Sequence, residues 1–169
     1  MACVLDVSRA LKNPGQSYEF SVELTLPEYE IAGDTVRFSN VKASGSLVSG
    51  EDDITARGTA AATLSAHCAR CLEAVSMDVE TEIEVLFTLT SDDPDVYKLD
   101  NHSIEMEDPV QDALLLEIPM RFLCSEECKG LCPTCGHNLN EGPCTCQEGD
   151  EVTTPFSALR NIVQVNKEV

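Results

Sequence analysis

Nine cysteines are the residues of this chain whose type and spacing could do chemistry. They stand at Cys3, Cys68, Cys71, Cys124, Cys128, Cys132, Cys135, Cys144 and Cys146. The first stands alone, and the other eight fall into four short-range pairs that read C-A-R-C, C-S-E-E-C, C-P-T-C and C-T-C. Zinc in structural sites is bound tetrahedrally by four cysteine or histidine side chains. The pairs therefore predict two zinc sites of four thiolates each, with Cys3 left as an inert thiol.

Disulfide bonding and redox catalysis compete with this interpretation. Disulfides persist in oxidising compartments, but the N-terminus, MACVLDVSRA, lacks the basic stretch and apolar stretch of a secretory signal. We therefore expect a cytoplasmic protein with reduced thiols. A redox C-x-x-C motif belongs near a βαβ pattern. Cys68–Cys71 instead lies between two strand-like runs, and Cys132–Cys135 lies among glycine and proline.

The clearer predicted site runs from Cys132 to Cys146. Its first pair is followed by Gly136, which allows the chain to turn so that backbone N–H groups point at sulfur. The second pair, Cys144 and Cys146, returns after eight residues, as in a short zinc ribbon. His137 is an alternative ligand, and it is less favoured because four thiolates are already at hand.

The other predicted site consists of Cys68, Cys71, Cys124 and Cys128. A metal held by these two pairs would join a hairpin tip to the C-terminal segment. One alternative stays open, in which Cys128 joins the later cluster. Neither site has the open position that catalytic zinc needs, so metal catalysis is not expected. Two occupied sites would take the formal net charge from −19 to roughly −23.

Alternating apolar and polar residues predict a sheet of long strands around these cysteines. Residues 18–26 and 35–49 are strand-like, with Gly45 as a candidate bulge. Residues 54–66 and 75–89 alternate in the same way on either side of C-A-R-C. We therefore expect a long hairpin whose tip carries two metal ligands and whose second strand has an acidic, solvated outer face.

The second half of the chain is predicted to contain two helices. Residues 91–107 are polar and acidic and are typical of a loop. Asp108 and Pro109 predict the start of a helix near residues 108–118, capped by Asp108 and ended by Pro119. A short last helix begins at Thr154-Pro155, and it either docks on the core or binds a partner.

These elements predict an α+β fold. It consists of a mainly antiparallel β-sheet with a long hairpin, one packed helix, a C-terminal zinc-knuckle segment and a short terminal helix. The predicted divisions are a β-rich core over residues 1–122, a cysteine-rich zinc segment over residues 123–150, and a terminal helix and tail over residues 151–169.

The charge balance restricts the partners. Asp and Glu number 30 against 11 Lys and Arg, and no two basic residues are adjacent. Phosphate-backbone binding relies on a basic patch, so we expect a basic protein partner rather than naked nucleic acid. Solubility is the alternative role of this acidity. No apolar stretch approaches the roughly 20 residues of a membrane span, so no membrane partner is expected.

No catalytic pattern accompanies the cysteines. The chain has three histidines and lacks Ser/His/Asp, phosphate-loop and dinucleotide motifs. We therefore expect neither enzymatic activity nor a small-molecule substrate. His67, beside Cys68, is expected to support the metal site rather than to act as a catalyst.

Four motifs together resemble the YceD family. They are C-A-R-C-L (Cys68–Leu72), L-E-I-P (Leu116–Pro119), L-C-S-E-E-C-K-G-L-C-P-T-C-G-H-N-L-N-E-G-P-C-T-C (Leu123–Cys146) and P-F-S-A-L (Pro155–Leu159). The third looks like the cysteine-rich form of that family. The resemblance implies a bacterial or plastid protein needed for normal accumulation of large-subunit (23S) ribosomal RNA, without known enzymatic activity.

The resemblance also bears on the metal ligands. Some relatives lack the second cluster but keep metal-ligand residue types where Cys68, Cys71, Cys124 and Cys128 stand here, which favours the long-range site. The helix start Thr154-Pro155-Phe156 departs from the Asp-Pro-Arg of many cysteine-rich members. That departure puts the C-terminal contact in question, not the fold.

Residues and resemblance together predict a non-enzymatic, zinc-binding factor in large ribosomal subunit biogenesis. Its expected partner is a ribosomal protein or a pre-ribosomal particle of the large subunit. One alternative is a zinc-ribbon protein that binds nucleic acid directly, although Leu123–Asp150 carries Lys129 as its one cation. Another is a redox-switched chaperone that loses zinc on oxidation.

Overall fold

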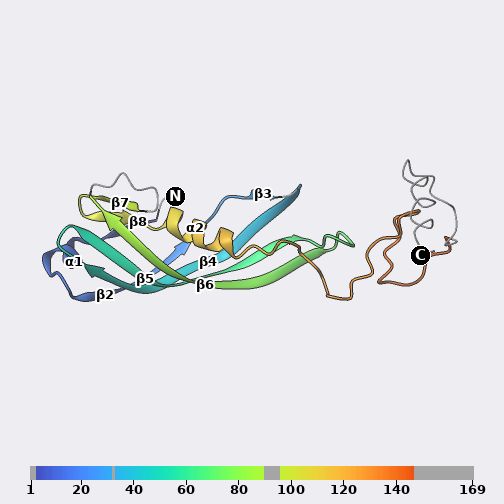
Figure 1. Ribbon diagram of the computed structural model, residues 1–169, viewed down its shortest axis with the longest axis horizontal. Coiled ribbons are helices and arrows are strands. Elements are labelled where there is room, and N and C mark those ends of the chain that lie inside the picture. The colour runs from blue at the N-terminus through green and yellow to red at the C-terminus, as the bar shows by residue number, and fades with distance from the viewer. Residues whose placement is uncertain (1–2, 32, 90–95, 147–169) are drawn as a thin grey trace, which may run out of the picture. The chain divides into compact units, whose positions relative to one another are not determined.

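The alternation of apolar and polar residues along the chain produces a sheet of long strands. The computed structural model describes residues 3–31, 33–89 and 96–146. Within them the elements are β1 Val4–Asp6, α1 Ser8–Lys12, β2 Ser17–Leu24, β3 Tyr29–Ile31, β4 Asp34–Ser49, β5 Asp53–His67, β6 Ala74–Thr88, β7 Tyr97–Asp100, β8 Ser103–Glu105 and α2 Glu107–Leu116 (Figure 1). This is an α+β chain dominated by strands.

The sheet is antiparallel in all its described pairings except one. The strands lie in the order β1-β8-β7-β6-β5-β4-β2, and β3 pairs with β4. Only β6 and β7 are parallel, over Phe87–Tyr97 and Thr88–Lys98. The predicted long hairpin is β5–β6, whose register runs without a break from Asp53↔Thr88 to His67↔Ala74. The tip of this hairpin carries C-A-R-C.

Gly45 is not a bulge. It lies directly opposite Gly58 in the β4–β5 pairing, and the register irregularity falls between Ser39 and Lys42 instead. A Cβ atom at Gly45 would overlap the Arg57 carbonyl and lie 2.6 Å from the Gly58 Cα. The prediction of a bulge was wrong. The glycine is needed here because two strands approach each other closely, not because one strand contains an extra residue.

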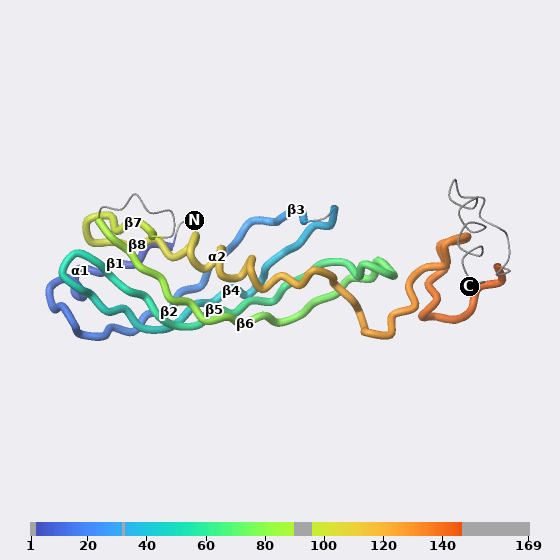
Figure 2. The backbone as a smooth tube through the Cα atoms, in the orientation of Figure 1, coloured from blue at the N-terminus to red at the C-terminus, as the bar shows by residue number. Residues whose placement is uncertain are grey.

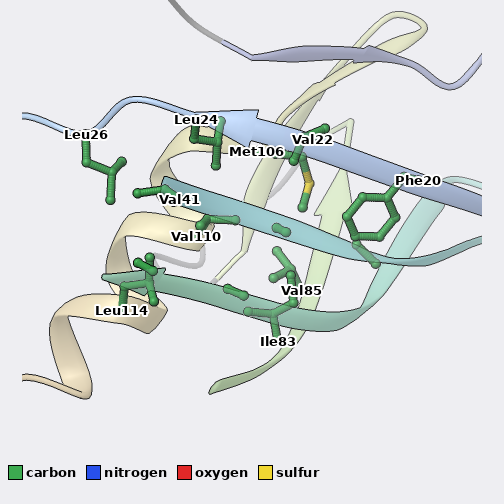
Figure 3. Packing of buried hydrophobic residues seen from close by; sticks show 14 of the residues in the cluster. Phe20, Val22, Leu24, Leu26, Val41, Ile83, Val85, Met106, Val110 and Leu114 are labelled. Carbon is green, nitrogen blue, oxygen red and sulfur yellow. The ribbon is translucent and has the colours of Figure 1, made fainter. Parts of the chain in front are cut away.

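One face of the sheet is covered by α2, as predicted. Met106, Val110 and Leu114 pack against apolar residues of β2, β4 and β6 such as Val22 and Val85 (Figure 3). The last turn of the helix reaches β6, where the Thr81 hydroxyl donates to Glu117 at 3.0 Å. The helix thereby leads the following segment toward the hairpin tip, a path that Figure 2 traces.

The ends of α2 differ from the prediction. The helix begins at Glu107 with Met106 as its N-cap and without a side-chain cap, so Asp108 lies in the first turn instead. An acidic residue there is still favourable next to the helix dipole. The helix ends at Leu116, before the predicted residue 118, and the Glu117 N–H bonds back to Leu114 at 3.2 Å in a tighter turn.

Residues 91–107 are not a continuous loop. They contain the short strands β7 and β8, in which Leu99 and Ile104 lie opposite each other and are buried. Two apolar residues among polar neighbours anchor this hairpin to the core, too few to create a visible alternation. The N-terminal β1 and α1 were also not predicted.

The chain divides into two compact units, residues 1–130 and 131–169. The first unit contains the sheet and takes in Cys124 and Cys128, which the sequence had suggested as part of a separate segment. The second unit is described for residues 131–146, so the predicted helix from Thr154 lies outside the described residues. No helix among the described residues is long and apolar enough to cross a bilayer.

Candidate metal centres

The hairpin tip presents the first pair of thiols. The Cys68 N–H donates to the Glu73 carbonyl at 2.8 Å, and the Leu72 N–H donates to the Cys68 carbonyl at 2.9 Å. Leu72 adopts a positive φ of 62°, which reverses the chain directly after Cys71. This tight turn brings Cys68 and Cys71 to the same side of the tip.

The second pair reaches the tip from the segment after α2. The Ala69 N–H donates to the Phe122 carbonyl at 2.8 Å, which places the chain beside the hairpin before Cys124. The Arg70 guanidinium then donates to the main-chain carbonyls of Glu126 at 3.1 Å and Cys128 at 2.9 Å. Main-chain and side-chain hydrogen bonds therefore position both pairs.

The four sulfurs of this first group form a compact cluster. The Cys68 and Cys128 sulfurs are 3.8 Å apart, and those of Cys71 and Cys124 are 3.5 Å apart. All four sulfur atoms lie within 4.8 Å of one another. Tetrahedral zinc with bonds of about 2.3 Å requires sulfurs about 3.8 Å apart, so the group fits such an ion. Cys124 is exposed, and the other three are buried.

The thiols of this group do not hold their protons equally. Burial raises the pKa of Cys68, but the backbone N–H groups of Cys71, Arg70 and Cys124 outweigh it and lower that pKa to about 6. Cys124 shows the opposite effect, because its hydrogen bond with Cys128 raises its pKa. One thiolate forms readily, and further ones require a positive charge among them.

The second group lies entirely within the second unit. The Cys132 N–H donates to the His137 carbonyl at 2.8 Å, and the Gly136 N–H donates to the Cys132 carbonyl at 2.9 Å. Gly136 has a φ of 73°, a value that favours glycine. A bridge between Leu131 and Asn138 closes this small loop. The predicted turn around C-P-T-C-G is therefore present.

The sulfurs of the second group also meet. Those of Cys132 and Cys144 are 3.4 Å apart, and all four, with Cys135 and Cys146, lie within 4.8 Å of one another. The backbone N–H groups of Cys135 and Thr134 lower the pKa of Cys132 to about 6. Contact with Cys135 is the main cause that raises the pKa of Cys146 to about 12. Again one thiolate is prepared, and the rest need a cation.

The grouping of sulfurs bears on two alternatives that the sequence left open. Cys128 lies with Cys68, Cys71 and Cys124, not with the later cluster. His137 belongs to neither group. Each group could hold a metal ion in four-sulfur coordination, without a position kept open for substrate. Ligation by zinc stays a prediction.

Several supporting residues could not be recognised from the sequence. Arg70 lies between Cys68 and Cys71 in the sequence, but its guanidinium donates to main-chain carbonyls of the segment that carries Cys124 and Cys128. His67 contacts Asp34, with its backbone N–H and its Nδ1 each 2.7 Å from a carboxylate oxygen. This contact fastens the end of β5 to the start of β4. Cys3 belongs to neither group, and its half-burial raises the pKa of its thiol.

Comparison with known families agrees with the cysteine motifs. Residues 56–163 match the family model described as large ribosomal RNA subunit accumulation protein YceD. The chain belongs to the YceD family. The matched range takes in all but the first three residues of the β5–β6 hairpin and every cysteine of both groups, so both candidate metal centres lie within the family region.

Two bacterial relatives match most of the chain. An uncharacterised protein of Mycobacterium tuberculosis is 29% identical over 150 residues, which are 82% of this chain and 72% of the relative. The protein YlbN of Bacillus subtilis is 30% identical over 126 residues, 71% of this chain and 73% of the relative.

A plant relative carries a functional name. The Arabidopsis thaliana protein called large ribosomal RNA subunit accumulation protein YCED homolog 1, chloroplastic, is 36% identical over 63 residues. Those residues are 36% of this chain and 20% of the relative. No solved structure matches the chain.

Proposed function

We propose that this protein is a non-enzymatic factor of large ribosomal subunit biogenesis that supports the accumulation of 23S ribosomal RNA. Membership of the YceD family is the observation that carries the proposal. The name of the Arabidopsis relative points the same way. The two four-sulfur groups, which keep no position for substrate, support a structural rather than a catalytic role for the metal.

The acidity of the chain supports a protein partner. With a formal net charge of −19, the chain is repelled by naked RNA and attracted to basic proteins. Ribosomal proteins of the large subunit, or a pre-ribosomal particle that displays them, fit this charge. Zinc in both groups would keep four thiolates around each dication and leave the charge no less acidic.

Removal and restoration of the gene test the biological role. A bacterial host that lacks its own family member should show a lower ratio of 23S to 16S ribosomal RNA. Expression of this chain, or of its Cys3→Ser variant as a matched control, should restore the ratio. An unchanged ratio in the deletion strain, or failure of the wild-type chain to restore it, would contradict the proposal.

Affinity capture tests the class of partner. The tagged full chain is incubated with lysate before and after nuclease treatment, and the bound proteins are identified by mass spectrometry. Large-subunit ribosomal proteins should remain bound after nuclease. If their capture disappears, RNA carries the contact and the nucleic-acid alternative is favoured; binding to RNA should then weaken steeply with added salt.

A further inference from the structure

The long strand β6 has an open edge. It pairs with β5 along its whole length, whereas on its other side it meets β7 only at Phe87 and Thr88 (Figure 1). From Val75 to Leu86, that side has no strand partner among the described residues, and none of the backbone hydrogen bonds outside the ladders involves it. Unpaired backbone groups along a strand are a template for an added strand.

The register determines which residues face this open edge. Because the Cys68 N–H donates to the Glu73 carbonyl, odd-numbered residues of β6 direct their backbone groups toward β5. Even-numbered residues direct theirs toward the open edge, and their side chains lie on the exposed outer face. Between Val75 and Leu86 they are Ser76, Asp78, Glu80, Glu82, Glu84 and Leu86. From Asp78 to Glu84, free backbone groups and carboxylates therefore come from the same residues.

Of these carboxylates, Asp78 accepts a hydrogen bond from the Thr63 hydroxyl at 2.9 Å, and Glu80 and Glu82 have no basic residue directly opposite them in the sheet. Glu84 forms an ion pair with Arg57 at 2.6 Å. Glu80 and Glu82 lie opposite the uncharged residues Ala61 and Thr59. Neither of them forms an ion pair within the described part of the chain. A basic strand added at this edge would supply the missing charges.

We propose that the open edge of β6 between Val75 and Leu86 binds an extended, basic segment of a protein partner, which adds to the sheet as a further strand. This stretch accommodates an added strand of the usual five or six residues. Alternate side chains of the segment face Glu80 and Glu82, which selects lysine or arginine. The side chains between them lie on the opposite face of the sheet, where Met77 is 40% exposed. Apolar residues suit those positions of the segment.

A second copy of the chain is a poor occupant of the same edge. Pairing of β6 with β6 would bring the carboxylates of both copies together, and like charges on paired strands are destabilising. Carboxylates at an edge also prevent aggregation. The same two residues therefore repel a second copy and attract a basic segment. The proposal rests on the proposed function only in assigning that segment to a large-subunit ribosomal protein.

A proline at position 82 blocks this edge selectively. Glu82→Pro removes an N–H that faces the open edge and leaves the bonds between β6 and β5 in place. A double variant, Glu80→Lys with Glu82→Lys, reverses the charges without touching the backbone. Glu19→Gln changes a carboxylate on the same face of the distant strand β2 and is the matched control. Circular dichroism and zinc content show whether each full-length variant is folded.

The probe is a fluorescein-labelled nine-residue peptide of alternating lysine and valine. Its twin carries N-methyl groups on the central lysine and valine, which block strand pairing on both peptide edges. By fluorescence anisotropy, the wild-type chain and Glu19→Gln should bind the first peptide equally. Binding should weaken by about tenfold or more for the methylated twin, for Glu82→Pro and for the double variant.

Several results would overturn the proposal. They are absence of peptide binding, equal binding of both peptides, or folded edge variants that bind like the wild type. A wild-type dimer in sedimentation velocity that Glu82→Pro abolishes would assign the edge to a second copy instead. If Glu82→Pro captures large-subunit proteins as the wild type does, the edge proposal fails and the proposed function stands. If the wild type neither captures them nor restores 23S ribosomal RNA, the proposed function fails whatever the peptide does.

Discussion

The Arg70 guanidinium donates to the main-chain carbonyl of Cys128 across 2.9 Å and so links the two halves of the first sulfur group. Arg70 lies in the hairpin turn, between Cys68 and Cys71. A second bond, to the Glu126 carbonyl, strengthens this link. Because neither bond uses a sulfur atom, both leave the four sulfurs available to a metal ion.

Replacement of Arg70 by methionine should therefore weaken metal binding at the first group alone. Hydrogen bonds from a charged donor contribute about 1.5–3 kcal/mol in shielded positions and less at the surface. We expect zinc affinity at this group to fall by about tenfold, and competition with a chromophoric chelator measures it. Arg57→Met, which removes an arginine from the sheet face, is the control. Zinc retention equal to that of the wild type would contradict the prediction.

Zinc stoichiometry tests the division of the eight cysteines. Native protein should contain two zinc ions, and Cys68→Ser and Cys132→Ser should each contain one, because each removes a ligand from a different group. Cys3→Ser should keep both. Inductively coupled plasma mass spectrometry on the purified protein gives the count. Loss of both ions from one single variant would show that the two groups depend on each other.

The contact between Asp34 and His67 predicts a dependence of stability on pH. Hydrogen bonds from His67 hold the pKa of Asp34 below its ordinary value. The carboxylate thus stabilises the fold above the ordinary carboxyl pKa of about 4, and this stabilisation is lost as the pH falls through the lower pKa of the folded protein. Asp34→Asn should lower the free energy of unfolding at neutral pH and flatten its decline in acid.

Urea unfolding across this pH range measures the effect. Asp52→Asn, in the exposed turn between β4 and β5, is the comparison. Acid also releases zinc, but both variants share that loss, so the difference between them isolates the Asp34 contact. Parallel pH profiles for the two variants would show that Asp34 contributes nothing.

A methyl group at Gly45 should destabilise the sheet. Its Cβ would overlap the Arg57 carbonyl, which belongs to the backbone of the neighbouring strand and cannot rotate away. Overpacking of this kind costs about 1–3 kcal/mol, and we expect Gly45→Ala to reach the upper part of that range. Ser44→Ala, one residue earlier, should stay within about 0.5 kcal/mol of the wild type. Thermal unfolding of both variants measures the difference. Equal stability of Gly45→Ala and Ser44→Ala would contradict the close approach of the two strands at Gly45.

Sequence reasoning was most successful where the signal is local. The hairpin around C-A-R-C follows from the period-two alternation of two long strands, and the C-P-T-C-G turn follows from the conformational freedom of Gly136. The membership of Cys124 and Cys128 in the first group was harder, because spacing alone also allowed Cys128 to join the later cluster. That choice is made by contacts such as the one between Ala69 and Phe122.

Other features leave too little trace in the sequence. The strands β7 and β8 are held by Leu99 and Ile104, which stand among polar residues and show no alternation. The N-cap of α2 falls on Met106, whose side chain is buried in the core rather than bonded to the helix end. Packing here overrides the capping preference that pointed to Asp108.

The two sulfur groups differ in the length of chain that a bound ion would close. In the first, Cys68 and Cys128 are 60 positions apart, whereas in the second, Cys132 and Cys144 are 12 apart. Closure of the longer loop removes about 4 kcal/mol of conformational freedom from the unfolded chain. During synthesis, that loop cannot close until residue 128 has left the ribosome, after all the strands that the structure describes. An ion at the first group would therefore bind a chain whose described strands have all been made, whereas the second group, although it is synthesised later still, needs only its own short stretch of chain.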